Sequence, residues 1–139
     1  WQHVLEPLSG YLLLGSYLSK NKHLSGESFN FGPTSNNNYS VEVIIREFSK
    51  HWKFSSPEQA YKIIDEIKFH EAGLLRLNCD KAFTKLKWSP TLHFAELIEF
   101  TSSWYYKFYN DEKDMYDYTA NQIHKYEKLA GEKHLKWTR

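Results

Sequence analysis

The chain contains 139 residues, which is enough for one domain of ordinary size. Hydrophobic residues make up 41% and charged residues 25%, as in ordinary globular proteins, so a low-complexity or wholly disordered chain is excluded. The 18 Lys and Arg nearly balance the 17 Asp and Glu, and a net charge of +1 gives no electrostatic basis for nucleic-acid binding. No apolar run approaches the roughly 18 residues of a membrane span, so we expect no membrane partner.

Two residue counts bear on the context of the chain. Cys79 is the single cysteine, so no internal disulfide can form, and we expect a reducing, cytoplasmic environment. Met115 is the single methionine, and the segment that starts at Trp1 lacks the features of a signal peptide. We therefore expect a fragment of a longer protein.

The predicted elements begin with a helix from Trp1 to Tyr17, in which apolar residues recur every three or four positions. The spacing predicts one apolar stripe, formed by Trp1, Val4, Leu5, Leu8, Tyr11, Leu12 and Gly15. Ser28 to Phe31 predicts a short strand that Gly32-Pro33 ends. Ser40 is the predicted N-cap of a helix that runs to about Trp52.

The middle of the chain is less regular. Gln59 to Ile67 is compatible with a strand or a short helix, and partial alternation of apolar residues favours the strand. Leu74 to Leu77 predicts a short extended segment. Asp80 is the predicted start of a helix through Leu86.

Two more helices complete the pattern. The clearest one starts at Thr91, and its predicted inner face consists of Phe94, Leu97, Ile98, Thr101, Trp104, Tyr105 and Phe108. A last helix is predicted from Tyr116 to Leu129, and the basic tail from Gly131 to Arg139 is expected to fray. Trp52, Trp88 and Trp104 are interpreted as core residues. Dominant helices with two short strands indicate an α/β or α+β class.

Several sequence blocks, taken in order, carry a resemblance. They are Trp1-Gln2-His3-Val4, Glu6 to Leu14, Phe29-Asn30-Phe31-Gly32-Pro33, His70-Glu71-Ala72, Leu77 to Ala82, Leu86-Lys87-Trp88-Ser89-Pro90, and Asp114-Met115 with Tyr118 and Tyr126. In this order and spacing the chain resembles the C-terminal part of the CDP-glucose 4,6-dehydratase family, in the extended short-chain dehydrogenase/reductase group. The resemblance runs from Trp1 to about Leu129. Asn78 and Lys87 depart from it, where the family has aspartate and commonly glycine.

The resemblance implies a fold and an activity. The fold would be α/β: the helix-rich substrate-binding portion of a Rossmann-type enzyme, with a few short strands. Such lyases bind NAD on an N-terminal Rossmann domain and convert CDP-glucose to CDP-4-keto-6-deoxyglucose plus water. They supply deoxysugars for bacterial surface polysaccharides such as the O-antigen of lipopolysaccharide. Their catalytic and NAD-binding residues lie upstream of Trp1, so the resemblance implies an enzyme as the full-length parent and an inactive fragment here.

The same resemblance implies a domain organisation. Residues 1–130 would form the nucleotide-sugar-binding part, of which 1–33 would pack on the missing Rossmann domain, and 131–139 a basic tail. Without that domain the helix around Leu5 to Leu18 leaves apolar surface uncovered, so we expect a homo-oligomer. Two alternatives stay open: another nucleotide-sugar epimerase, reductase or dehydratase, and a non-catalytic interaction module derived from this domain.

Four substrate-binding residues follow from the resemblance. The amide of Asn30 would donate and accept hydrogen bonds to the base or ribose, although a turn-stabilising role is an equal alternative. His70 falls in a loop that in relatives reaches the ribose and diphosphate. Lys68 lies near the position of a diphosphate-binding arginine and is otherwise an ordinary solvated lysine. Tyr118 matches a tyrosine of the family's C-terminal region.

No self-sufficient catalytic motif accompanies these residues. The six glycines form neither a dinucleotide fingerprint nor a phosphate loop, and no His-Glu-x-x-His motif is present. Tyr109 and Lys113 have the spacing of the Tyr/Lys pair of short-chain dehydrogenases, but they span a predicted helix end with no nucleotide-binding strand before it. We expect neither a catalytic residue nor a metal ligand in this chain.

Overall fold

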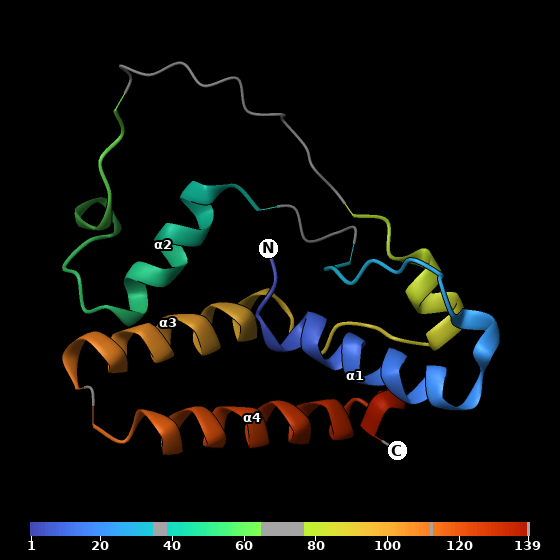
Figure 1. The fold of residues 1–139 in the computed structure, drawn as a ribbon. Coiled ribbons are helices and arrows are strands. Elements are labelled where there is room, and N and C mark those ends of the chain that lie inside the picture. The colour runs from blue at the N-terminus through green and yellow to red at the C-terminus, as the bar shows by residue number, and fades with distance from the viewer. Residues whose placement is uncertain (35–38, 65–76, 112, 139) are drawn as a thin grey trace.

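The computed structural model describes residues 1–34, 39–64, 77–111 and 113–138. These ranges contain the α-helices α1 (Leu5–Lys20), α2 (Val41–His51), α3 (Phe94–Asn110) and α4 (Met115–Glu132), and the shorter helical turns η1 (Lys22–Leu24), η2 (Pro57–Ala60), η3 (Ala82–Leu86) and η4 (Lys136–Thr138). Figure 1 shows α3 and α4 side by side, with α2 crossing α3 and α1 beside the second half of α4.

Local hydrogen bonds explain where two of the helices begin. The hydroxyl of Ser40 accepts from the backbone N–H of Val43 at 3.3 Å, which confirms the predicted N-cap of α2. The carboxylate of Glu96 accepts from the backbone N–H of His93 at 2.7 Å and so closes the first turn of α3. The helix predicted from Thr91 therefore begins later, at Phe94.

The core consists of two clusters of buried side chains. The first comprises Ile44, Leu92, Leu97, Ile98, Phe100 and Tyr126, and the second comprises Leu13, Phe31, Ala82, Leu86 and Trp88. Trp137, from η4, packs against both clusters. The tail prediction was therefore wrong for residues 131–138, because Trp137 stacks on Tyr126 and Lys133 is held by hydrogen bonds.

The described residues contain no strand, so the strand predictions and the α/β class find no support in them. Ser28 to Phe31 is irregular. Side-chain contacts, and not the hydrogen bonds of a sheet, fix the position of this segment. The carbonyl of Phe31 accepts from Gln2, and its ring packs edge-on against Trp88 with centroids 5.0 Å apart. Gln59 and Ala60 belong to η2, residues 61–64 are irregular, and residues 65–67 lie outside the description.

The apolar stripe predicted for the first helix is largely its exposed face. Leu8, Tyr11 and Leu12 are exposed, the last at 77%. The buried residues of α1 are instead Glu6, Ser9, Gly10 and Leu13. The polar side of the helix is buried because the backbone N–H groups of Thr91 and Leu92 bind Glu6 and the ring of Phe31 packs on Gly10. The described part of the chain covers little of the most apolar side.

The prediction for α3 was right in its first half. Leu97 and Ile98 are buried, while Tyr105 and Phe108 near the end of the helix are exposed. Trp88 is fully buried as predicted, at 1% exposure. In the ranges that the structure covers, none of the helices combines the length and apolar character needed to span a bilayer.

The backbone conformation of residue 87 accounts for one departure from the resemblance, the lysine in place of a common glycine. This residue ends η3 in the left-handed conformation, with φ 56° and ψ 29°. Glycine adopts that conformation without the cost that a side chain adds, so a glycine before the tryptophan suits the same turn. The lysine here keeps the turn and its Trp88 N–H to Ala82 carbonyl bond of 3.3 Å.

Candidate functional site

Asn30 lies in the irregular segment between α1 and α2 and reaches the turn that precedes η3. Its Nδ2 donates to the carbonyl of Asn78 at 3.1 Å. The side chain of Asn78 in turn accepts from the backbone N–H of Asp80 at 2.9 Å. Asn30 itself is exposed. The contact therefore gives Asn30 a bracing role and leaves its amide oxygen, within the described ranges, as an acceptor.

A close backbone approach joins the same two segments. A Cβ added at Gly32 would lie 3.2 Å from Sγ of Cys79, so only glycine fits there without displacement. Burial raises the pKa of the Cys79 thiol, which favours its neutral form as a packing group. Two of the blocks that carry the family resemblance thus lie against each other in the fold.

The other predicted site residues are not gathered around Asn30. Lys68 and His70 lie outside the described residues. Tyr118 lies in the first half of α4 and lines a cavity of about 240 Å³ between α3 and α4, with Nζ of Lys107 5.9 Å from the centre of its ring. Figure 1 places that end of α4 far from η3. Among the described residues no contact joins Tyr118 to Asn30.

The Trp-Gln-His block at the start of the chain is held by backbone partners. Nε1 of Trp1 donates to the carbonyl of Tyr39 at 3.0 Å, and Nε2 of Gln2 donates to the carbonyl of Phe31 at 3.1 Å. Nδ1 of His3 accepts from the backbone N–H of Leu5 at 3.3 Å, and burial lowers the pKa of His3. The structure thus gives these side chains a part in tethering the segments that follow α1.

A buried polar network connects α1, the segment before α3, and α4. The Glu6 carboxylate, 1% exposed, accepts from the backbone N–H groups of Thr91 at 2.9 Å and Leu92 at 2.7 Å, and from the hydroxyl of Tyr126 at 3.0 Å. Ser9 Oγ accepts from Nε1 of Trp88 at 3.0 Å. No motif in the sequence pointed to this network, and its signal there was the presence of Glu6 and Ser9 in an apolar helix.

Burial dominates the electrostatics of this network. Desolvation raises the pKa of Glu6, although its hydrogen bonds and the charge of Lys133 pull the pKa the other way. Desolvation, followed by the negative charge of Glu6, raises the pKa of Tyr126. Both side chains are buried and out of reach of a ligand. We therefore assign the network a role in helix packing and none in catalysis or binding.

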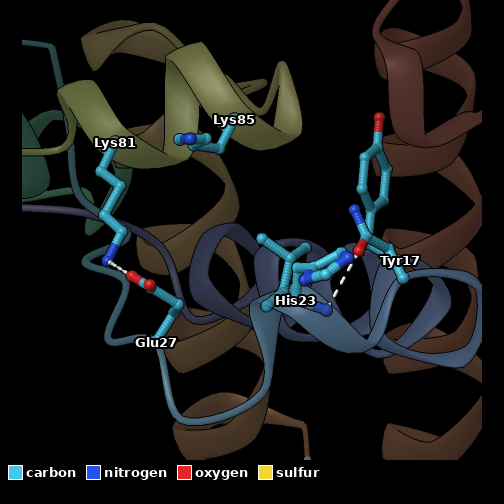
Figure 2. Close-up of a pocket in the computed structure, with 7 residues that line it drawn as sticks. Tyr17, His23, Glu27, Lys81 and Lys85 are labelled. Carbon is cyan, nitrogen blue, oxygen red and sulfur yellow. Dashed lines mark hydrogen bonds and ion pairs between the residues drawn. The ribbon is translucent and has the colours of Figure 1, made fainter.

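A second cavity of about 240 Å³ lies between the end of α1, η1 and η3 (Figure 2). It is lined by Tyr17, Asn21, His23, Leu24, Glu27, Lys81 and Lys85. Lys81 forms an ion pair with Glu27, and its Nζ lies 4.8 Å from the centre of the Phe29 ring. The hydrogen bond and charge of Lys81, with a smaller contribution from Lys85, lower the pKa of Glu27.

No motif predicted from the sequence pointed to this cavity. Its signal is the spacing of Lys81 and Lys85, which places both on one side of a helical turn. The polar run after α1 was interpreted only as a loop. Within the described part of the chain, no group of three His, Cys, Asp or Glu side chains is arranged to hold a metal ion.

Comparison with known proteins gives a distant relation. No protein-family model matches the chain. It is 33% identical over 105 residues to the CDP-glucose 4,6-dehydratase of Salmonella typhimurium. The matched region covers 76% of this chain and 28% of that relative, so most of the relative's length has no counterpart in the match. The chain is thus similar over three quarters of its length to part of a CDP-glucose 4,6-dehydratase.

Proposed function

We propose that the chain is the C-terminal substrate-binding part of an NAD-dependent CDP-glucose 4,6-dehydratase and is inactive alone. The observation that carries this proposal is the 33% identity over 105 residues to the Salmonella enzyme of that name. The contacts of Asn30 with Asn78 and of Gly32 with Cys79 support it, because they join two of the blocks on which the resemblance rests.

The proposal assigns substrate roles to four residues. Asn30 binds the base or ribose through its amide, and His70 and Lys68 bind the diphosphate as hydrogen-bond donor and point charge. Tyr118 is assigned a ligand contact on the resemblance alone, because the first half of α4 lies far from the turn that Asn30 reaches. The glycines of this chain form no dinucleotide fingerprint. NAD binding and the catalytic residues are therefore assigned to the part of the relative's length that the match does not cover.

The exposed apolar face of α1 is evidence that another structural element packs on this helix. Tyr11 and Leu12 of α1 are 59% and 77% exposed, and Val4, which precedes the helix, is 62% exposed. Exposed apolar side chains gain free energy when another element covers them, at roughly 25 cal/mol per Å². We assign this face to contact with the nucleotide-binding domain.

The test is turnover by the full-length protein that contains residues 1–139. With NAD supplied, CDP-, dTDP-, UDP- and GDP-glucose are offered separately, and formation of the 4-keto-6-deoxy sugar is followed. We expect turnover of CDP-glucose alone. Turnover of a different nucleotide sugar would contradict the assigned base, and a folded protein that binds NAD but turns over none of the four would contradict the dehydratase assignment.

A variant tests the assigned role of Asn30. We expect Asn30→Ala to raise KM for CDP-glucose about tenfold, the equivalent of one lost polar contact. The matched control is Asn110→Ala, because Nδ2 of Asn110 donates within its own helix, to the carbonyl of Tyr106 at 2.9 Å. An unchanged KM in Asn30→Ala would leave Asn30 with its bracing role alone.

A further inference from the structure

The cavity of Figure 2 has an excess of positive side chains. Lys85 belongs to η3 and Lys81 is the residue before it, and Figure 2 shows the Lys81 side chain directed at Glu27 in the loop after α1. Glu27 is the one acidic residue of the lining. It is engaged with Lys81, whereas Lys85 forms no ion pair with any residue that the structure describes. The two lysines and one glutamate give the lining one net positive charge.

Polar groups that donate hydrogen bonds complete the wall. Tyr17 contributes a hydroxyl and His23 an imidazole. The carboxamide oxygen of Asn21 accepts from the backbone N–H of His23 at 3.1 Å, which fixes the start of η1. Leu24 supplies an apolar side. Donors and cations on several sides with few acceptors are what an anionic ligand requires.

The size of the cavity limits the ligand. Its volume is about 240 Å³. Pockets that enclose drug-sized molecules have about 300–1,000 Å³. A whole nucleotide sugar therefore exceeds this cavity, whereas a phosphate group with a short carbon chain fits within it.

The ion pair between Lys81 and Glu27 holds Lys81 at the cavity, but it also places a carboxylate near any bound anion. Stacking over Phe29 and pairing with Glu27 keep Lys81 at the cavity. The side chains of Lys81 and Glu27 are 40% and 48% exposed, and exposed ion pairs are weak. A dianion can therefore replace Glu27 as the partner of Lys81, but the nearby carboxylate repels it.

We propose that this cavity binds a small phosphate monoester. Lys85 and Lys81 are the cations that pair with its oxygens. Glu27 weakens binding, because its carboxylate competes for Lys81 and leaves the lining one net positive charge against the two negative charges of the ligand. The proposal goes beyond the dehydratase function, since it stands on the lining of the cavity whatever reaction the full-length protein catalyses.

The test is calorimetric titration of the full-length protein with inorganic phosphate, glycerol 3-phosphate and CMP, taken separately. We expect Lys85→Gln to weaken binding of phosphate and glycerol 3-phosphate about tenfold, the effect of losing one charge-assisted contact. Glu27→Gln is expected to tighten both several-fold. The matched control is Lys128→Gln, which removes the same charge from a side chain 78% exposed on α4 and should change neither.

A change in net charge alone would also shift affinity in opposite directions in the two cavity variants, so the comparison with Lys128→Gln shows whether the cavity itself is responsible. No binding of either small phosphate, or equal weakening by Lys85→Gln and Lys128→Gln, would overturn the proposal. An effect of Lys85→Gln on CMP alone would overturn the small-ligand assignment in favour of a nucleotide. Affinity unchanged in both Lys85→Gln and Glu27→Gln would place any phosphate site elsewhere in the protein.

Discussion

At the scale of single residues, Glu6 is a carboxylate buried in the core, with 1% of its surface exposed. Its two carboxylate oxygens accept from two successive backbone N–H groups, those of Thr91 and Leu92, which would otherwise be buried without partners. The cost of burying the carboxylate is offset by these bonds and by the Tyr126 hydroxyl. One side chain thus joins residues more than 80 positions apart.

Replacing Glu6 by glutamine tests that role. The amide group of Glu6→Gln presents two N–H donors where the backbone already donates, so one buried N–H loses its acceptor. We expect the free energy of unfolding to fall by about 1–3 kcal/mol, with faster hydrogen exchange of the Thr91 and Leu92 amides. Glu99→Gln is the control, because that side chain is exposed, and it should change stability by less than about 0.5 kcal/mol. Equal effects in the two variants would refute the role.

At the scale of elements, the two glycines of α1 separate its buried and exposed sides. A Cβ at Gly10 would collide with the ring of Phe31, whereas a Cβ at Gly15 would meet nothing within 4 Å. We expect Gly10→Ala to lower the free energy of unfolding by about 1–3 kcal/mol through overpacking. Gly15→Ala should raise it by about 0.5–1 kcal/mol, since alanine is the better helix former. Thermal denaturation of both variants checks the pair, and a stabilised Gly10→Ala protein would contradict this packing.

Glu96 couples the start of α3 to the residue that follows α4. Partial burial alone would raise the pKa of Glu96, but the hydrogen bonds from Lys133 and the His93 N–H, with the charge of Lys133, hold the pKa below its ordinary value. Nζ of Lys133 lies 2.8 Å from this carboxylate and 2.7 Å from the carbonyl of Thr91. Lys133 therefore connects the segment after α4 to the start of α3.

The lowered pKa gives this link a pH dependence. Because the folded pKa of Glu96 lies below the unfolded one, its contribution is complete above the ordinary value of 4.5 and is lost as pH falls through the folded pKa. We expect Glu96→Gln to cost about 1 kcal/mol near neutral pH, and this cost to shrink under acid. Urea denaturation across the pH range measures it, with Glu132→Gln as the control. A cost that grows as pH falls would have the wrong sign.

At the scale of the whole molecule, two modest core clusters share Trp137, and one side of α1 is left uncovered. The exposed row that includes Leu8, Tyr11 and Leu12 has little to pack against in the described residues. Such a row drives association with whatever apolar surface is available. In the dehydratase proposal that surface belongs to the nucleotide-binding domain, and in the isolated chain it would belong to another copy.

Self-association of the 139-residue chain is the corresponding prediction. We expect light scattering to show a mass that rises with concentration, and Leu12→Glu to shift the chain toward monomer because a charge on this row would have to be desolvated. Ile63→Glu is the matched control, since Ile63 is similarly exposed, at 71%, and lies outside α1. A monodisperse monomer at all concentrations, or equal effects of the two variants, would show that α1 does not mediate association.

The sequence alone determined the positions of the long helices, because spacing and capping are local properties. The Ser40 cap and the regular repeat through Leu97 and Ile98 were sufficient for α2 and α3. The resemblance also indicated the relative that the comparison found. Only the tertiary structure decided which side of α1 is buried, since Glu6 and Gly10 face partners more than 20 residues away. It likewise decided that Ser28 to Phe31 is irregular and that Lys81 and Lys85 meet His23 across a cavity, because strand pairing and pocket formation depend on distant segments.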